Sequence, residues 1–101
     1  MMPLYLVRRE LPGATREDID AASFRAIACA FTFEGLRWIS SYWDADAGRI
    51  HCVYEAQSPQ QIEDHSRRAR IPCDEIRPVD QVLPEQYSEE LAGQGNASQT
   101  A

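Results

Sequence analysis

The side chains best suited to chemistry lie close together, between Arg49 and Pro72. This stretch contains both histidines of the chain, His51 and His65, and one of its three cysteines, Cys52. Imidazole and thiolate are ligands that nickel, copper and zinc all accept, and the ligand types alone do not choose among these metals. The stretch is therefore a candidate site for a divalent transition metal.

The first part of this stretch, Arg49–Glu55, alternates in character and is rich in β-branched and aromatic residues, which predicts a strand with two different faces. Successive side chains of a strand point to opposite sides. Ile50, Cys52 and Tyr54 therefore share one face of this strand. His51 lies on the other.

A helix is predicted over residues 59–70. Ser58 is a helix N-cap, and Pro59 suits the first helical position because no partner is needed there for its missing N–H. His65 follows the core-facing Ile62 by three residues, so it lies beside the apolar stripe of this helix. If the Cys52 face of the strand meets the helix, Cys52 and His65 point into the same layer.

Two interpretations of these side chains stay open. Either Cys52 and His65 bind metal, or Cys52 is a small buried hydrophobe and His65 a partly buried histidine bonded to a neighbouring carbonyl. His51, with Glu55 on the same side of the strand, is a weaker metal candidate, and the alternatives for it are a dimer contact or a solvated strand face. The candidate metal ligands are thus His65, Cys52 and His51, and no residue is assigned a catalytic or cofactor-binding role.

The remaining elements define the fold class. Strands are predicted at residues 4–10, 37–46 and 75–83, and a helix of about 18 residues begins at a capping box of Thr15 and Asp18. The order strand, helix, strand, strand, helix, strand predicts an α+β, ferredoxin-like βαββαβ sandwich, with a four-stranded antiparallel sheet and two helices on one face. This domain spans residues 2–83, and residues 84–101 form a polar tail that we expect to be disordered apart from a possible helical turn after Pro84.

Periodicity also assigns faces within two of these elements. In the strand at residues 37–46, Trp38, Ser40 and Tyr42 are predicted to share one face. The packing stripe of the first helix is predicted from three- and four-residue spacing. Its members are Ile19, Ser23, Ala26, Ile27, Ala30 and Phe31.

Composition excludes several classes of function. The chain has 101 residues, 44% of them hydrophobic, and a net charge of −6, and all ten basic residues are arginine. An acidic domain without a basic stripe cannot offset many phosphates, so nucleic acid is not expected as a partner. The sequence has no apolar run of about 18 residues and no secretory signal pattern, so we expect a cytoplasmic protein without a membrane span. Three cysteines without a CxxC spacing indicate neither a disulfide framework nor a zinc knuckle.

Three of the ten basic residues, Arg67, Arg68 and Arg70, form a cluster at the end of the second helix. Glu63 and Asp64 precede Arg67 and Arg68 by four residues, the spacing at which opposite charges meet on a helix. We interpret the cluster as helix charge pairs, and an anion site is the alternative.

A sheet with helices on one side leaves its other face bare, so a symmetric homodimer through that open face is expected. Tyr42, Trp38 and Arg8 are candidates to line a pocket there, by analogy of fold with dimeric ferredoxin-like enzymes that act on small molecules. The sequence contains no nucleophile elbow, no phosphate-binding glycine loop and no HExxH motif. Whether the protein is an enzyme stays open.

Five segments form a pattern through their order and spacing: residues 2–5 (MPLY), 9–13 (RELPG), 38–42 (WISSY), 52–56 (CVYEA) and 62–65 (IEDH) through 71–72 (IP). Together they resemble a bacterial family of small proteins of unknown function that includes nickel-binding proteins with a dimeric ferredoxin-like fold. The resemblance covers roughly residues 2–83 and implies that the chain binds nickel or another divalent transition metal. The sequence departs from the family pattern at Arg70, where glycine is usual and takes a left-handed conformation more easily.

Three hypotheses of function result. The first is a small nickel-binding protein that acts as a metal buffer or sensor. The second is a dimeric ferredoxin-like enzyme acting on a small molecule. The third is an interaction module without catalysis.

Overall fold

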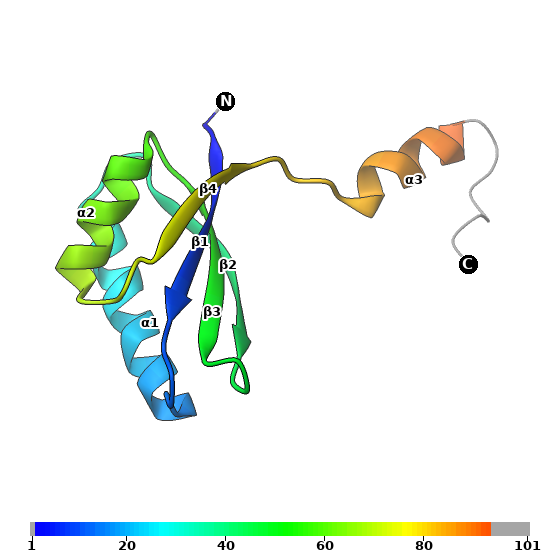
Figure 1. The fold of residues 1–101 in the computed structure, drawn as a ribbon. Helices are drawn as coiled ribbons and strands as arrows, with labels where there is room; N and C mark the ends of the chain where they lie inside the picture. Colours follow the sequence, from blue (N-terminus) through cyan, green and yellow to red (C-terminus); the bar gives the residue numbers. More distant parts are fainter. Residues whose placement is uncertain (1, 94–101) are drawn as a thin grey trace.

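The protein has two layers, a β-sheet and helices packed on one face of it, in a computed structural model that describes residues 2–93 (Figure 1). Its elements in chain order are β1 (Leu4–Glu10), α1 (Arg16–Ala30), β2 (Arg37–Asp44), β3 (Arg49–Glu55), α2 (Pro59–Ala69), β4 (Glu75–Val79) and α3 (Pro84–Gly93). The strands form one antiparallel sheet in the order β2-β3-β1-β4. Helices α1 and α2 lie on the same side of that sheet (Figure 1). The ferredoxin-like arrangement predicted from the sequence is confirmed.

Local capping signals fix where the two packed helices begin. The Thr15 hydroxyl accepts a hydrogen bond from the backbone N–H of Asp18, and the Asp18 carboxylate accepts one from the backbone N–H of Thr15. These two bonds lower the pKa of Asp18. At α2, the Ser58 hydroxyl accepts from the backbone N–H of Gln61, and Pro59 occupies the first turn. Both predicted helix starts are confirmed.

The inner side of α1 differs from the predicted stripe. Ile19 and Ala26 are buried, but Ile27 is 43% exposed and Phe31 is 86% exposed. One residue advances an α-helix by about 100°, so Ile27 lies well round the helix from Ala26. The assignment of Ile27 and Phe31 to the packing face is therefore wrong.

Strand β2 contains a β-bulge between Trp38 and Ser40. A bulge adds one residue to the strand, and because side chains alternate with a period of two, every later side chain changes face. The prediction that Trp38, Ser40 and Tyr42 share a face is therefore wrong. Trp38 lies on the side covered by the helices, together with Ser41 and Trp43, whereas Ser40 and Tyr42 lie on the open side.

Strand β4 is shorter than predicted. It ends at Val79, and Val82, which was expected to belong to it, is 68% exposed. The strand pairs only with β1, so Pro78 lies at the sheet edge, where its missing N–H breaks no ladder.

Beyond the sheet, the chain continues to α3, which points away from α1 and α2 (Figure 1). Its start is fixed locally, because the Gln86 side chain accepts from the backbone N–H of Leu83 and the Gln86 N–H donates to the Leu83 carbonyl. The polar tail thus forms a helix of ten residues where we expected at most one helical turn. The disorder expected for residues 94–101 concerns a segment outside the described residues, and the division at residue 83 stays a prediction.

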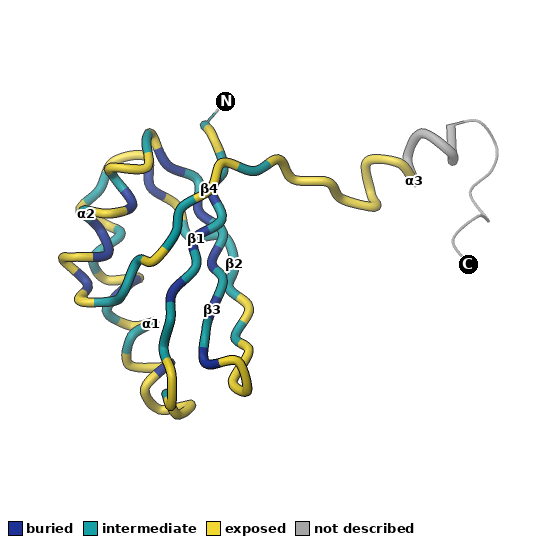
Figure 2. Tube along the Cα trace, in the orientation of Figure 1, coloured by how far each residue is buried: buried dark blue, intermediate teal, exposed yellow. Residues whose placement is uncertain are grey.

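The buried residues lie between the sheet and α1 and α2, as the dark segments of the tube show (Figure 2). The core cluster consists of Tyr5, Val7, Leu36, Ile50, Cys52, Tyr54, Ala56 and Ile62.

None of the helices within residues 2–93 is long and apolar enough to cross a membrane.

Arg70 ends α2 in the left-handed conformation, with φ of 59° and ψ of 48°. Replacing Arg70 by Gly should raise the free energy of unfolding by about 0.5–1 kcal/mol, because glycine has no β-carbon to strain this backbone. Arg70→Ala is the matched control, since it removes the same charge and keeps the β-carbon. Urea unfolding measures both, and equal stability of the two variants would contradict a strained helix end.

Candidate functional site

His65 lies on the inner side of α2 with none of its surface exposed. Its ring centroid is 5.8 Å from that of Phe33 and 5.6 Å from that of Tyr54. Nε2 is 2.8 Å from the carbonyl oxygen of Ala26 on α1, and since a carbonyl can only accept, Nε2 carries the proton. Nδ1 is buried and has no hydrogen-bond partner among the described residues. The imidazole therefore joins α2 to α1.

The electrostatics of this pocket keep His65 neutral. Burial is the main cause that lowers its pKa, the bond to Ala26 acts in the opposite direction, and the charge of Arg9 lowers the pKa further. A neutral ring with a free Nδ1 lone pair is the form that binds metal. Phe33 and Tyr54, which flank it, are poor ligands.

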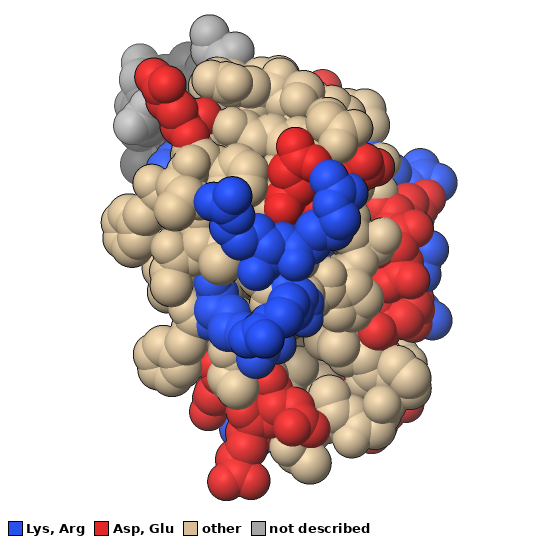
Figure 3. Space-filling view, turned by 90° about the vertical axis from the view of Figure 1, so that its left-hand side faces the viewer, with Lys and Arg blue, Asp and Glu red and all other residues tan. Residues whose placement is uncertain are grey.

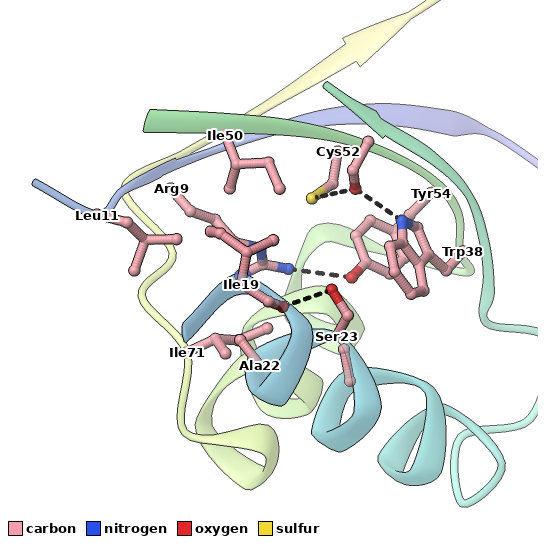
Figure 4. A pocket seen from close by; sticks show the side chains of 12 residues that line it. Arg9, Leu11, Ile19, Ala22, Ser23, Trp38, Ile50, Cys52, Tyr54 and Ile71 are labelled. Carbon is pink, nitrogen blue, oxygen red and sulfur yellow. Dashed lines mark hydrogen bonds between the residues drawn. The ribbon is translucent and has the colours of Figure 1, made fainter. Parts of the chain in front are cut away.

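Cys52 lies on the helix-covered face of β3 and is 4% exposed. Its sulfur accepts a hydrogen bond of 2.7 Å from the Ser41 hydroxyl, and that hydroxyl accepts one of 2.8 Å from Trp38 Nε1 (Figure 4). The structure therefore places Cys52 in the same layer as His65. Tyr54, two residues along the strand from Cys52, contacts the His65 ring.

His51 lies on the opposite, open face of β3. In the sheet register it stands between Tyr42 of β2 and Arg8 of β1. It is partly buried, and its ring forms no hydrogen bond with another residue of the described chain. Because the sheet separates His51 from Cys52 and His65, the three candidate ligands do not meet in one chain.

The described residues of one chain do not make a complete metal centre. Within residues 2–93, no three or more His, Cys, Asp or Glu side chains lie close enough together to hold a metal ion. Structural transition-metal sites in proteins have about four protein ligands. None of the three predicted residues therefore belongs to a cluster of three such side chains within residues 2–93.

The open face around His51 is rich in charge pairs. Arg8 pairs with Glu10 and, at 3.3 Å, with Glu75. Arg77 and Arg8 both donate to the Glu75 carboxylate and lower its pKa. Tyr42, 66% exposed, and Arg8 lie on this face as predicted, but Trp38 does not, so the pocket expected from these three residues is not formed.

Arg9 is a functional candidate that the sequence analysis missed. It is 2% exposed and lies on the helix-covered face of β1. Its guanidinium donates to the Ser66 hydroxyl, the Pro72 carbonyl and the Tyr54 hydroxyl. The available signal was the alternation of Tyr5, Val7 and Arg9, which places all three side chains on one face.

His65 gives the stability a pH dependence of known sign. Its pKa is lowered in the folded state, so the unfolded chain binds a proton that the folded chain does not. Stability should therefore be complete above pH about 6.5 and fall as the pH decreases below that value toward the folded pKa. In the His65→Gln variant this contribution, at most about 1.4 kcal/mol per pH unit, should be absent. The measurement is the difference between the free energies of unfolding in urea at pH 7.5 and at pH 5.5. A wild-type slope in His65→Gln would contradict a neutral buried ring.

Comparison with known proteins gives the family. The crystal structure of SCO4226 from Streptomyces coelicolor A3(2) matches with a TM-score of 0.71 and 22% identity, over 79% of this chain and 99% of that one, and this likeness shows the fold. A structure described as "putative Antibiotic biosynthesis monooxygenase" from Chloroflexus aurantiacus J-10-fl has a TM-score of 0.49 and 18% identity, over 82% and 95% of the chains, and carries no argument. No curated protein matches the chain. The family model "Nickel responsive protein SCO4226-like" matches residues 5–79, so the chain belongs to the SCO4226-like family of nickel-responsive proteins.

Proposed function

We propose that this protein binds nickel, or a similar divalent transition metal, as a homodimer and acts as a metal buffer or sensor. Membership in a nickel-responsive family supports the choice of metal. The observation that carries the site is His51, whose ring is not used by the fold, whereas the ring of His65 holds two helices together. We therefore place the metal on the open face and keep His65 and Cys52 as the alternative ligands.

The open face has the composition of an interface. α1 and α2 cover only the other side of the sheet (Figure 1). Leu4, Leu6 and Val53 are partly buried neighbours in the sheet register on this face. Acidic and basic side chains alternate around them, as in the pairs formed by Arg37 with Glu55 and Arg49 with Glu10. Such a surface complements itself under twofold symmetry, because each arginine of one copy can face a carboxylate of the other.

A twofold dimer also supports a metal site, because it brings the open faces of two chains together. Each copy contributes the His51 imidazole and carboxylates such as Glu10 and Glu75, which lie beside Arg8 next to His51. Nitrogen and oxygen donors of this kind suit divalent nickel. Completion of the ligand set by a second chain would link metal binding to assembly.

The first prediction concerns assembly. The protein should sediment as a dimer at micromolar concentration, because burial of the open face removes apolar area from water. Replacing Val53 by Glu adds a like charge to this face and should shift the equilibrium to monomers. Glu63→Gln, a charge change on the exposed side of α2, is the control and should leave the mass unchanged. A wild type that sediments as a monomer would contradict the dimer.

The second prediction concerns metal affinity. In nickel titrations of protein prepared without an affinity tag, His51→Ala should weaken binding by about tenfold or more, which corresponds to about 1.4 kcal/mol. His65→Gln and Cys52→Ser should stay within about twofold of the wild type if the metal lies on the open face. Loss of binding in these two variants but not in His51→Ala would move the site to the helix-covered layer. A wild-type dimer that binds no nickel would favour the interaction module.

A further inference from the structure

Arg9 is a buried cation without an anionic partner. Its Nη1 donates to the Ser66 hydroxyl at 2.8 Å and to the Pro72 carbonyl at 2.6 Å, and its Nη2 donates to the Tyr54 hydroxyl at 3.3 Å. All three acceptors are neutral. None of the described carboxylates forms an ion pair with Arg9.

This arrangement leaves the charge and one donor uncompensated. Nε of Arg9 is buried and has no partner among the described residues. Burial acts to lower the pKa of Arg9, but Tyr54 and Cys52 raise it by more, so the guanidinium stays charged. Removing an ion from water costs several kcal/mol unless opposite charge or hydrogen bonds offset that cost. A bound anion would supply both.

A cavity of about 30 Å³ lies beside Arg9, between α1 and the sheet (Figure 4). One water molecule needs about 10–15 Å³ by this measure, so the cavity accommodates about two water-sized groups, the size of a carboxylate. Arg9, Ser23, Ser41, Cys52 and Tyr54 are among the residues that line the cavity, whose wall is mainly apolar. The apolar part of the wall comes from Leu11, Ile19, Ala22, Ala26, Trp38, Ile50 and Ile71.

A groove of about 190 Å³ lies between α1 and the segment that follows α2. The groove and the cavity share part of their lining, namely Leu11, Ile19, Ala22 and Ile71. Arg25 and Arg70 line the groove, with Asp18 as its acidic member. Basic side chains also gather on the helix-covered side of the molecule (Figure 3). Local positive charge of this kind attracts anions even to a protein of net charge −6.

We propose that the cavity binds the carboxylate group of a small organic acid. Arg9 attracts the carboxylate through its charge, the apolar walls of the groove contact the carbon chain, and Arg25 and Arg70 attract the acid at the mouth. The site lies on the opposite side of the sheet from His51, so it does not depend on the nickel site proposed there.

The wild-type protein is tested by NMR, with the Nε–H resonance of Arg9 as the signal. Sodium acetate, sodium succinate or sodium phosphate is added in place of sodium chloride, so that the ionic strength stays constant. Acetate and succinate should each give a saturable shift, accompanied by the indole N–H of Trp38, which bonds to Ser41 at the cavity wall. Tighter binding of succinate would identify a dicarboxylate that also contacts the arginines of the groove. No saturable shift with either acid, or a shift with phosphate alone, would overturn the proposal.

Variants separate binding at Arg9 from general charge effects. Arg9→Met should lose at least about tenfold in affinity. The change also removes the donor that Ser66, Tyr54 and the Pro72 carbonyl share, so circular dichroism is used to check that the variant is folded. Arg70→Gly should weaken binding by about two- to fivefold, the range expected for one exposed charge. Arg67→Met, which removes a charge from α2 outside the groove, is the control and should bind as the wild type does.

If Arg9→Met does not fold, the wild-type titration and the comparison of Arg70→Gly with Arg67→Met still test whether the acid binds at this site. Unchanged affinity in a folded Arg9→Met would show that the acid does not bind at Arg9. Equal losses in Arg70→Gly and Arg67→Met would show that the effect is nonspecific screening rather than binding in the groove.

Discussion

The contact on which both layers of the fold depend is the buried guanidinium of Arg9. A single side chain from β1 bonds to Tyr54 of β3, to Ser66 of α2 and to the Pro72 carbonyl ahead of β4. One residue before Ser66, His65 joins α2 to α1. Polar contacts thus run from the sheet through both helices inside an otherwise apolar layer. Hydrogen bonds are directional, so these contacts set how the helices sit on the sheet more narrowly than apolar packing would.

Much of the fold could be predicted because its signals are local. Thr15 with Asp18, and Ser58 with Pro59, mark helix starts through backbone groups a few residues away. The faces of β2 could not be predicted in the same way. Ser40 and Ser41 are adjacent and chemically identical, so nothing in the sequence marks the bulge there. On α1, the buried residues are Ile19 and Ala26, whereas the adjacent Ile27 lies about 100° further round the helix and is exposed, so side-chain size did not mark the packing face.

The candidate site was predictable in its layers but not in its contacts. Strand alternation placed Cys52 and His51 on opposite faces, and helix spacing placed His65 in the same layer as Cys52. The bond from His65 to the Ala26 carbonyl joins residues 39 positions apart, and no local pattern records it. Arg9 was missed for a different reason. Its alternation with Val7 predicts burial, but charge at the end of an apolar run usually marks where a strand reaches solvent.

Each face of the sheet has a polar side chain whose bonding capacity the described residues do not use. On the helix-covered face, Nε of Arg9 is buried and has no hydrogen-bond partner among the described residues. On the open face, the His51 imidazole belongs to no group of three His, Cys, Asp or Glu side chains within the described residues. Both features meet on β3, where Cys52 lines the cavity and His51, one residue away, faces the other side. A ligand that shifts β3 against α1 must therefore also move His51. Any such coupling would be reciprocal, so that metal on the open face would change the affinity of the cavity by the same factor.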